Sequence, residues 1–237
     1  MAYGTESVPQ VDKIFGPGNR YVTKAKQMVT DRVAIDMPAG PSEVLVMADA
    51  TARPAFVAAD MLSQAEHGPD SQAILVCKDE DFALKVQAEI VRQAGLLTRA
   101  ESVAQSLEQS RIVVLDTREQ MVDFANTYAA EHLIISMENP WDIAEAITAA
   151  GSIFIGNYSP ESAGDYASGT NHTLPTSGWA RAYSGVNIDS FMRKITFQEL
   201  TQEGLTRLAP TIVAMADAEG LDAHAAAVKI RLQQTSE

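Results

Sequence analysis

Four histidines, His67, His132, His172 and His224, are the starting point for any chemistry, because the 237 residues contain no others. Gln64 precedes His67 by three positions in SQAEHG, so the two side chains share one face of a helix. An imidazole and an amide oxygen at this spacing could bind a metal. Glutamine is an uncommon zinc ligand, however, and a histidine at a helix end more often interacts with the helix dipole.

Glu131 and His132 form an adjacent acid–imidazole pair directly before the apolar run LIIS. The imidazole can act as a general base while the carboxylate positions or activates water. The pair is expected between a helix and a strand, away from the carboxyl edge where the sites of α/β sheets usually lie. Taken alone, such a pair is more often a surface feature than a site.

Asp165 and His172 lie in the loop GDYASGTNHTLPTSG, which is rich in small and turn-forming residues. Aspartate and neutral histidine suit zinc, and glycine lets the backbone approach a ligand closely, so we interpret this loop as functional. Glu219 and His224 in AEGLDAHAAAV predict, by themselves, only a helix cap and an exposed histidine. No HExxH, CxxC, GxSxG or Walker motif occurs, and FGPGN lacks the third glycine of a dinucleotide fingerprint. Spacing alone therefore supports at most a metal-assisted enzyme.

Short apolar runs that alternate with helical patterns would position these side chains. The predicted strands are Val44–Met47, Ala73–Cys77, Ile112–Leu115, Leu133–Ser136 and Ser152–Ile155. The predicted helices between them are Arg53–His67, Glu80–Ala94, Arg118–Ala130 and Trp141–Ala150. Strands that are apolar throughout are covered on both faces, and β-α alternation favours parallel pairing. We predict an α/β fold: a Rossmann-like, mostly parallel sheet with flanking helices and a small C-terminal helical tail domain.

The two ends of the chain differ from this middle region. A helix at Asn19–Arg32 and a short strand, VAID, predict that residues 1–43 are the remnant of a second Rossmann-like unit. Residues 44–190 would form the Rossmann-like domain, although Gly156–Ser190 shows no clear elements. Residues 191–237 would be a dimerisation tail, with a possible strand at Ile195–Leu200 and two helices in Thr201–Gln234, separated near Glu219–Leu221.

Composition narrows the possible partners. Asp and Glu number 31 against 18 Lys and Arg, a net charge of −13 that disfavours nucleic acid and anionic membranes as partners. No apolar run reaches the roughly 20 residues of a membrane span, and the first residues lack a signal-peptide pattern. The single cysteine, Cys77, lies in AILVC and is interpreted as a core residue. These features predict a cytoplasmic protein.

Six separated stretches resemble the histidinol dehydrogenase family in their order and residues: VDKIFGPGN, IDMPAGPSEVLVMAD, DMLSQAEHGPDSQ, AAEHLI, AGDYASGTNHTLPT and AEGLDAHAAAV. Together they cover nearly the whole chain, and all four histidines fall at family site positions. The resemblance implies the oxidation of L-histidinol to L-histidine through histidinal, the last step of histidine biosynthesis. It also implies one zinc ion per subunit, NAD as hydride acceptor and an intertwined homodimer whose sites are shared between subunits.

The resemblance also implies roles for individual residues. The zinc ligands would be Gln64, His67, Asp165 and His224, the last supplied by the neighbouring subunit. The substrate would contact these four and also Ser42, His132, His172 and Glu219, with Glu219 likewise coming across the dimer. Glu131 and His132 would be the catalytic proton-transfer pair, and Asn19 would contact NAD.

Family members are nearly twice as long as this chain, so we expect it to correspond to a C-terminal portion. Asn19 is the one expected NAD contact that it contains, and we expect histidinol oxidation by these residues alone to be weak or absent. Two alternatives remain open. One is a related zinc- and NAD-dependent dehydrogenase of another polar alcohol. The other is a non-catalytic, zinc-binding fragment that dimerises.

Overall fold

The computed structural model describes residues 1–16 and 18–233. It divides into two compact units, Met1–Phe191 and Met192–Glu237, which are described separately. The division falls beside the predicted start of the tail at residue 191. The assignment of residues 1–43 to a second Rossmann-like unit stays a prediction.

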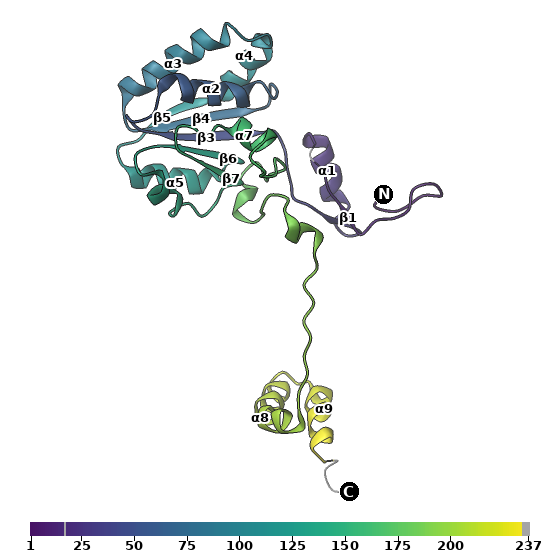
Figure 1. Cartoon of the computed structure of the whole chain (residues 1–237). Helices are drawn as coiled ribbons and strands as arrows, with labels where there is room; N and C mark the ends of the chain where they lie inside the picture. Colours follow the sequence, from purple (N-terminus) through teal and green to yellow (C-terminus); the bar gives the residue numbers. More distant parts are fainter. Residues whose placement is uncertain (17, 234–237) are drawn as a thin grey trace. The chain divides into compact units, whose positions relative to one another are not determined.

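Five parallel strands form the sheet of the first unit (Figure 1). Their spatial order is β5-β4-β3-β6-β7. Their bounds are β3 (Glu43–Ala48), β4 (Gln72–Cys77), β5 (Arg111–Val114), β6 (His132–Ser136) and β7 (Ser152–Ile155). Every residue of the central strand β3 and of its neighbour β6 is buried, because helices cover both faces of the sheet. The predicted α/β fold is confirmed, and Cys77 is a fully buried core residue.

Helices pack in two layers on the sheet (Figure 1). One core layer includes α2 (Pro54–Ala65), α3 (Glu80–Ala94) and α4 (Ala100–Gln109). The opposite layer includes α5 (Arg118–Tyr128) and α6 (Pro140–Ala144). Our sequence interpretation did not include α4, whose short apolar stripe contributes the buried Val103. It also extended the helices before β6 and β7 too far.

The C-terminal end of α5 sets the start of β6. A capping box of Thr117 and Gln120 begins this helix, and Ala129 ends it in the left-handed conformation at φ 54°. The reversal at Ala129 leaves Ala130 and Glu131 to lead directly into β6 at His132. The way in which α5 ends therefore sets the position of Glu131 and His132.

A smaller element pair precedes the sheet. Strands β1 (Lys13–Ile14) and β2 (Ala34–Ile35) pair in parallel on either side of α1 (Arg20–Met28). The buried Lys26 pairs with Asp36 and donates to the Gly16 carbonyl at 2.9 Å, while Gly16 N donates to Asp36 at 2.8 Å. These bonds fix the glycine turn against α1, which ends earlier than the predicted Asn19–Arg32 helix.

Residues 156–190 contain more structure than their composition suggested. They hold α7 (Glu161–Tyr166), the 3-10 turn η1 (Trp179–Arg181) and most of η2 (Ile188–Phe191). The helix α7 is short, so it leaves little periodicity in the sequence. It nevertheless carries site residues.

The second unit is a helix pair, α8 (Gln202–Ala218) and α9 (Asp222–Gln233), joined through Gly220 at φ 70°. This matches the predicted break near residues 219–221. The strand expected at Ile195–Leu200 is wrong, because the described structure gives these residues no strand partner. Ile195 and Phe197 are 65% and 93% exposed, so their alternating pattern reflects no buried face in this unit.

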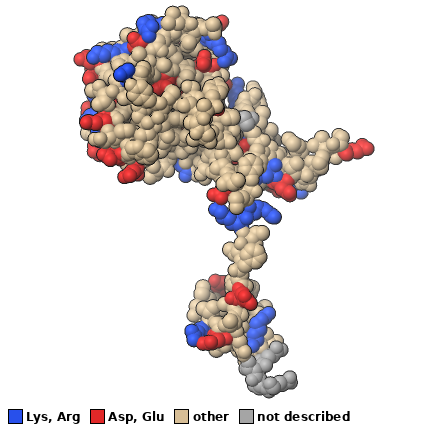
Figure 2. All heavy atoms as spheres, in the orientation of Figure 1, with Lys and Arg blue, Asp and Glu red and all other residues tan. Residues whose placement is uncertain are grey.

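Charged side chains of both signs interleave over the first unit on the face that Figure 2 shows, without one broad basic surface. Such a surface, with a net charge of −13, does not favour a polyphosphate partner. Among the described residues, no helix is both long and apolar enough to cross a membrane.

Candidate functional site

The candidate site lies at the amino ends of β3 and β6, where Val44 is in register with His132. A cavity of about 120 Å³ opens there, and its lining includes Ser42, His67, Glu131, His132, Asp165 and His172. The fold thus brings together residues from four separate stretches of the chain, between positions 42 and 172. The expectation that Glu131 and His132 lie away from the carboxyl edge of the sheet agrees with this position.

Backbone contacts hold Glu131 and His132 in place. Gly151 N donates to Ala130 O and Ser152 N donates to Glu131 O, both at 2.9 Å. A Cβ on Gly151 would lie 2.5 Å from Glu131 O, so only glycine permits this approach of the two chain segments. The loop before β7 therefore holds the backbone of the pair.

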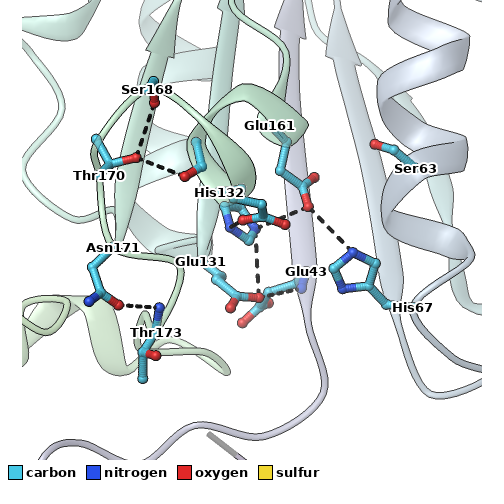
Figure 3. A network of polar contacts seen from close by, with 12 residues as sticks. Glu43, Ser63, His67, Glu131, His132, Glu161, Ser168, Thr170, Asn171 and Thr173 are labelled. Carbon is cyan, nitrogen blue, oxygen red and sulfur yellow. Dashed lines mark hydrogen bonds and ion pairs between the residues drawn. The ribbon is translucent and has the colours of Figure 1, made fainter.

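His132 is 2% exposed and neither ring nitrogen has a hydrogen-bond partner in the described structure. Its Nδ1 lies 3.7 Å from Glu131 Oε2 and 3.8 Å from Glu161 Oε1 (Figure 3). Its Nε2 lies 3.9 Å from Asp165 Oδ1. Burial lowers the pKa of His132 to about 4, although the charge of Asp165 opposes this shift. The imidazole is therefore neutral at physiological pH, which is the form that can act as a general base.

Glu131 is also buried, and burial raises its pKa well above the ordinary value of 4.5. Its carboxylate accepts a hydrogen bond from Glu43 N at 3.0 Å and another from the Ser42 side chain. The negative charges of Glu161 and Glu43 add to the rise in pKa. The hydrogen bonds from Ser42 and Glu43 N therefore hold the Glu131 carboxylate in place. Burial and the nearby carboxylates of Glu161 and Glu43 raise its pKa.

The helix α7 supplies two carboxylates, Glu161 and Asp165, which are four positions apart and share one helix face. Gly164 lies between them, and a Cβ there would lie 2.6 Å from the Phe154 ring. The absence of a side chain lets α7 rest on Phe154, whose ring centroid is 6.0 Å from that of His132. Close packing at glycine therefore brings both carboxylates to the imidazole.

Donor atoms of His67, Glu161 and Asp165 lie within 4.8 Å of one another, close enough for a shared metal ion. Gln64 on α2 is fully buried, and both of its amide atoms lack a hydrogen-bond partner in the described structure. An unpaired buried amide costs about 1–3 kcal/mol, which a bound ligand would offset. This mixed nitrogen and oxygen donor set fits zinc.

The electrostatics of the site favour a cationic occupant. Glu131, Glu161 and Asp165 lie together, yet no lysine or arginine of the described chain lines the cavity. Burial raises the pKa of Glu161 to about 8, with further contributions from the charges of Asp165 and Asp60. A divalent ion or a cationic ligand would relieve this unfavourable concentration of acids.

Asp60 lies on α2, one turn before Gln64, and burial raises its pKa from 3.8 to about 7. Because the folded state binds this proton more tightly than the unfolded state does, the associated stability is fully present below pH 3.8 and is lost as pH rises towards 7. We expect Asp60→Asn to raise the free energy of unfolding of the metal-free chain at pH 8 by about 1–2 kcal/mol, and by much less at pH 5. Urea denaturation at both pH values measures this difference.

The exposed Asp123 on α5 offers a matched control, and Asp123→Asn should change stability by no more than about 0.5 kcal/mol at either pH. Equal effects of Asp60→Asn at pH 5 and pH 8 would contradict the assigned ionisation of Asp60.

The remaining predicted residues lie in three places. Ser42 and the exposed His172 line the cavity. Asn19 caps α1, where its side-chain oxygen accepts from Tyr21 N at 3.0 Å and Val22 N at 3.2 Å, so any contact of this side chain with a cofactor would use its amide nitrogen. Glu219 is the C-cap of α8, and His224 lies in the first turn of α9, both in the second unit.

Our sequence interpretation missed Glu43 and Glu161. Glu161 and Asp165 are four positions apart, as are Asp60 and Gln64. This spacing, which places two side chains on one helix face, was the sequence signal that could have revealed Glu161. The signal was weak because six residues of α7 are too few to show a period.

The sheet and cavity define a class: a Rossmann-like α/β protein with a buried histidine–carboxylate site suited to a metal ion. An acetylating aldehyde dehydrogenase from Geobacillus thermoglucosidasius shares the fold alone, with a TM-score of 0.51 and 15% identity. Its alignment covers 81% of this chain and 58% of that structure.

The sequence profile of the histidinol dehydrogenase family matches residues 1–232, and the chain belongs to this family. It is 59% identical to a histidinol dehydrogenase from Bacteroides thetaiotaomicron over 98% of this chain and 54% of the relative. The crystal structure of histidinol dehydrogenase from Elizabethkingia anophelis aligns with a TM-score of 0.96 and 56% identity, over 100% of this chain and 55% of that one. The chain therefore spans about half the length of these relatives.

Proposed function

We propose that these residues form the zinc- and substrate-binding part of a histidinol dehydrogenase, which oxidises L-histidinol to L-histidine through histidinal and reduces two NAD⁺. The observation that carries the proposal is the assembly of His67, Asp165 and the Glu131–His132 pair around one cavity, with the buried and unpaired Gln64 three residues before His67. The family relationship supports histidinol over other polar alcohols as the substrate.

Gln64, His67 and Asp165 would hold the zinc ion, with His224 of the neighbouring subunit as a further ligand. The bound ion would supply a fixed anchor for the amino and imidazole nitrogens of the substrate, which sets the position of the reacting carbon. The buried acids at the site suit a substrate that carries positive charge. Ser42, His172 and the partner-supplied Glu219 would complete substrate binding.

His132 would take the alcohol proton as hydride leaves for NAD⁺, because its imidazole is neutral and buried beside the cavity. Glu131 would help a water molecule add to the aldehyde, and a second hydride transfer to NAD⁺ would then give the carboxylate. Asn19 would contribute to binding NAD. The residue types agree with this route, which needs no cysteine nucleophile.

The proposal includes a homodimer that shares its sites through residues 192–237, in a cytoplasmic biosynthetic enzyme. A second candidate is a zinc-binding, dimerising chain without turnover. The observations that favour it are the buried, unpaired Gln64 and the His67–Glu161–Asp165 group, which support metal binding whether or not turnover follows.

A direct test compares the 237-residue chain with a longer chain made by adding the N-terminal part of a closely similar relative. Formation of NADH and of histidine from histidinol would be followed before and after zinc removal. We expect zinc-dependent turnover by the longer chain and weak or no turnover by the 237 residues alone. Absence of histidine formation by a folded, zinc-loaded longer chain would overturn the proposed activity.

A further inference from the structure

We infer that Glu161 is an additional zinc ligand, which completes the metal site within one chain until His224 of a neighbouring subunit takes its place. The inference rests on the proposed zinc-binding function. It concerns a residue that the family resemblance did not assign, and it makes metal binding separable from subunit assembly.

The position of Glu161 carries the first step. Its Oε1 lies 4.0 Å from His67 Nε2 (Figure 3). Ligand-type atoms of Glu161, His67 and Asp165 all lie within 4.8 Å of one another. Ligands about 2.1 Å from a common tetrahedral ion stand about 3.4 Å apart. Small side-chain movements would therefore bring the three groups into one coordination sphere.

The burial of Glu161 carries the second step. The residue is 1% exposed, and its Oε2 has no hydrogen-bond partner in the described structure. A carboxylate in such surroundings needs a compensating partner, and Gln64, three residues before His67, is likewise buried with both amide atoms unpaired. A cation shared by Glu161, His67 and Asp165 would supply that partner to the Glu161 carboxylate.

A purely positioning role for Glu161 explains less. Its Oε1 lies 3.8 Å from His132 Nδ1, beyond the usual 2.7–3.2 Å range of an N–H···O hydrogen bond. The carboxylate therefore stands between two imidazoles, at hydrogen-bond distance from neither. Coordination of a shared ion accounts for this intermediate position.

The number of ligands that zinc takes relates Glu161 to His224. Gln64, His67 and Asp165 are three ligands, and a protein-bound zinc ion usually takes four. Glu161 supplies a fourth from the same unit, whereas the family resemblance assigns that position to the partner's His224. We therefore expect the two residues to substitute for each other in metal binding.

The test measures how tightly the metal-free 237-residue chain binds zinc, by competition with a chromophoric chelator. It asks whether Glu161 and His224 replace each other as zinc ligands. The variants are Glu161→Gln, His224→Ala and the double variant. We expect the double variant to bind zinc about tenfold or more weakly than His224→Ala. Glu138→Gln, an exposed carboxylate beyond the other end of β6, is the matched control and should leave affinity unchanged in the His224→Ala background.

If the double variant binds zinc as tightly as His224→Ala, Glu161 is not a ligand, while the proposed zinc site stands. If the parent chain binds no zinc, both this inference and the proposed function fail. Should Glu161→Gln prevent folding, Glu161→Asp provides the test, because it keeps the charge but withdraws the carboxylate. In the His224→Ala background the same tenfold loss is expected of Glu161→Asp, and an unchanged affinity would overturn the inference.

Discussion

His132→Asn should lower NAD-dependent histidinol oxidation by about 100-fold or more in a chain completed with the N-terminal part of a relative. Asparagine keeps a polar group at this buried position but cannot accept a proton at physiological pH. Steady-state turnover measures the loss. Zinc content should stay at that of the parent, because His132 is placed as a base and not as a ligand.

A loss of zinc that parallels the loss of turnover would contradict the role assigned to His132. So would a variant that keeps more than about a tenth of parental turnover at saturating substrate. Circular dichroism and urea denaturation would establish that the substituted chain folds, since the side chain is only 2% exposed.

Glu131→Gln should affect the second half-reaction far more than the first. Only the conversion of aldehyde to acid requires an added water molecule, and glutamine keeps the shape of the side chain without its basicity. We expect a loss of about 100-fold when histidinal is supplied as substrate, and less than about tenfold for the first NADH formed from histidinol. Single-turnover kinetics with each substrate separate the two steps.

Equal losses in both half-reactions would instead assign Glu131 to the orientation of His132. The geometry makes this comparison informative, because Glu131 Oε2 lies 3.7 Å from His132 Nδ1 while it accepts the Glu43 backbone hydrogen bond. The amide of glutamine could still accept that bond after rotation, so the backbone of β3 would keep its place.

The sheet could be predicted from sequence because its strands are buried on both faces. A run such as AILVC, four to eight residues long and apolar throughout, is typical of a strand covered on both faces. The predicted strands agree with β3 to β7 within one residue at each end. The predicted strand at Ile195–Leu200 failed for the opposite reason. Its alternation of Ile195 and Phe197 has no partner strand in the described structure, and β-like sequence forms a strand only when its backbone can pair.

The site was predictable only in part. Types and spacing of residues identified Gln64 with His67 and Glu131 with His132, but they did not show that His67, Glu131 and His132 line one cavity. The close approach of these segments depends on two glycines, and their close contacts are seen only in the folded structure. Gly151 admits Glu131 O, and Gly164 admits the Phe154 ring. Neither contact leaves a periodic signal in the chain.

Zinc-edge anomalous diffraction from crystals of the chain grown with zinc and histidinol tests the central claim most directly. The account predicts one strong anomalous peak per chain, within coordination distance of Gln64, His67 and Asp165, at the amino ends of β3 and β6. A zinc-loaded, folded chain whose anomalous peak lies elsewhere, with Gln64 and His67 contacting no metal, would contradict the account.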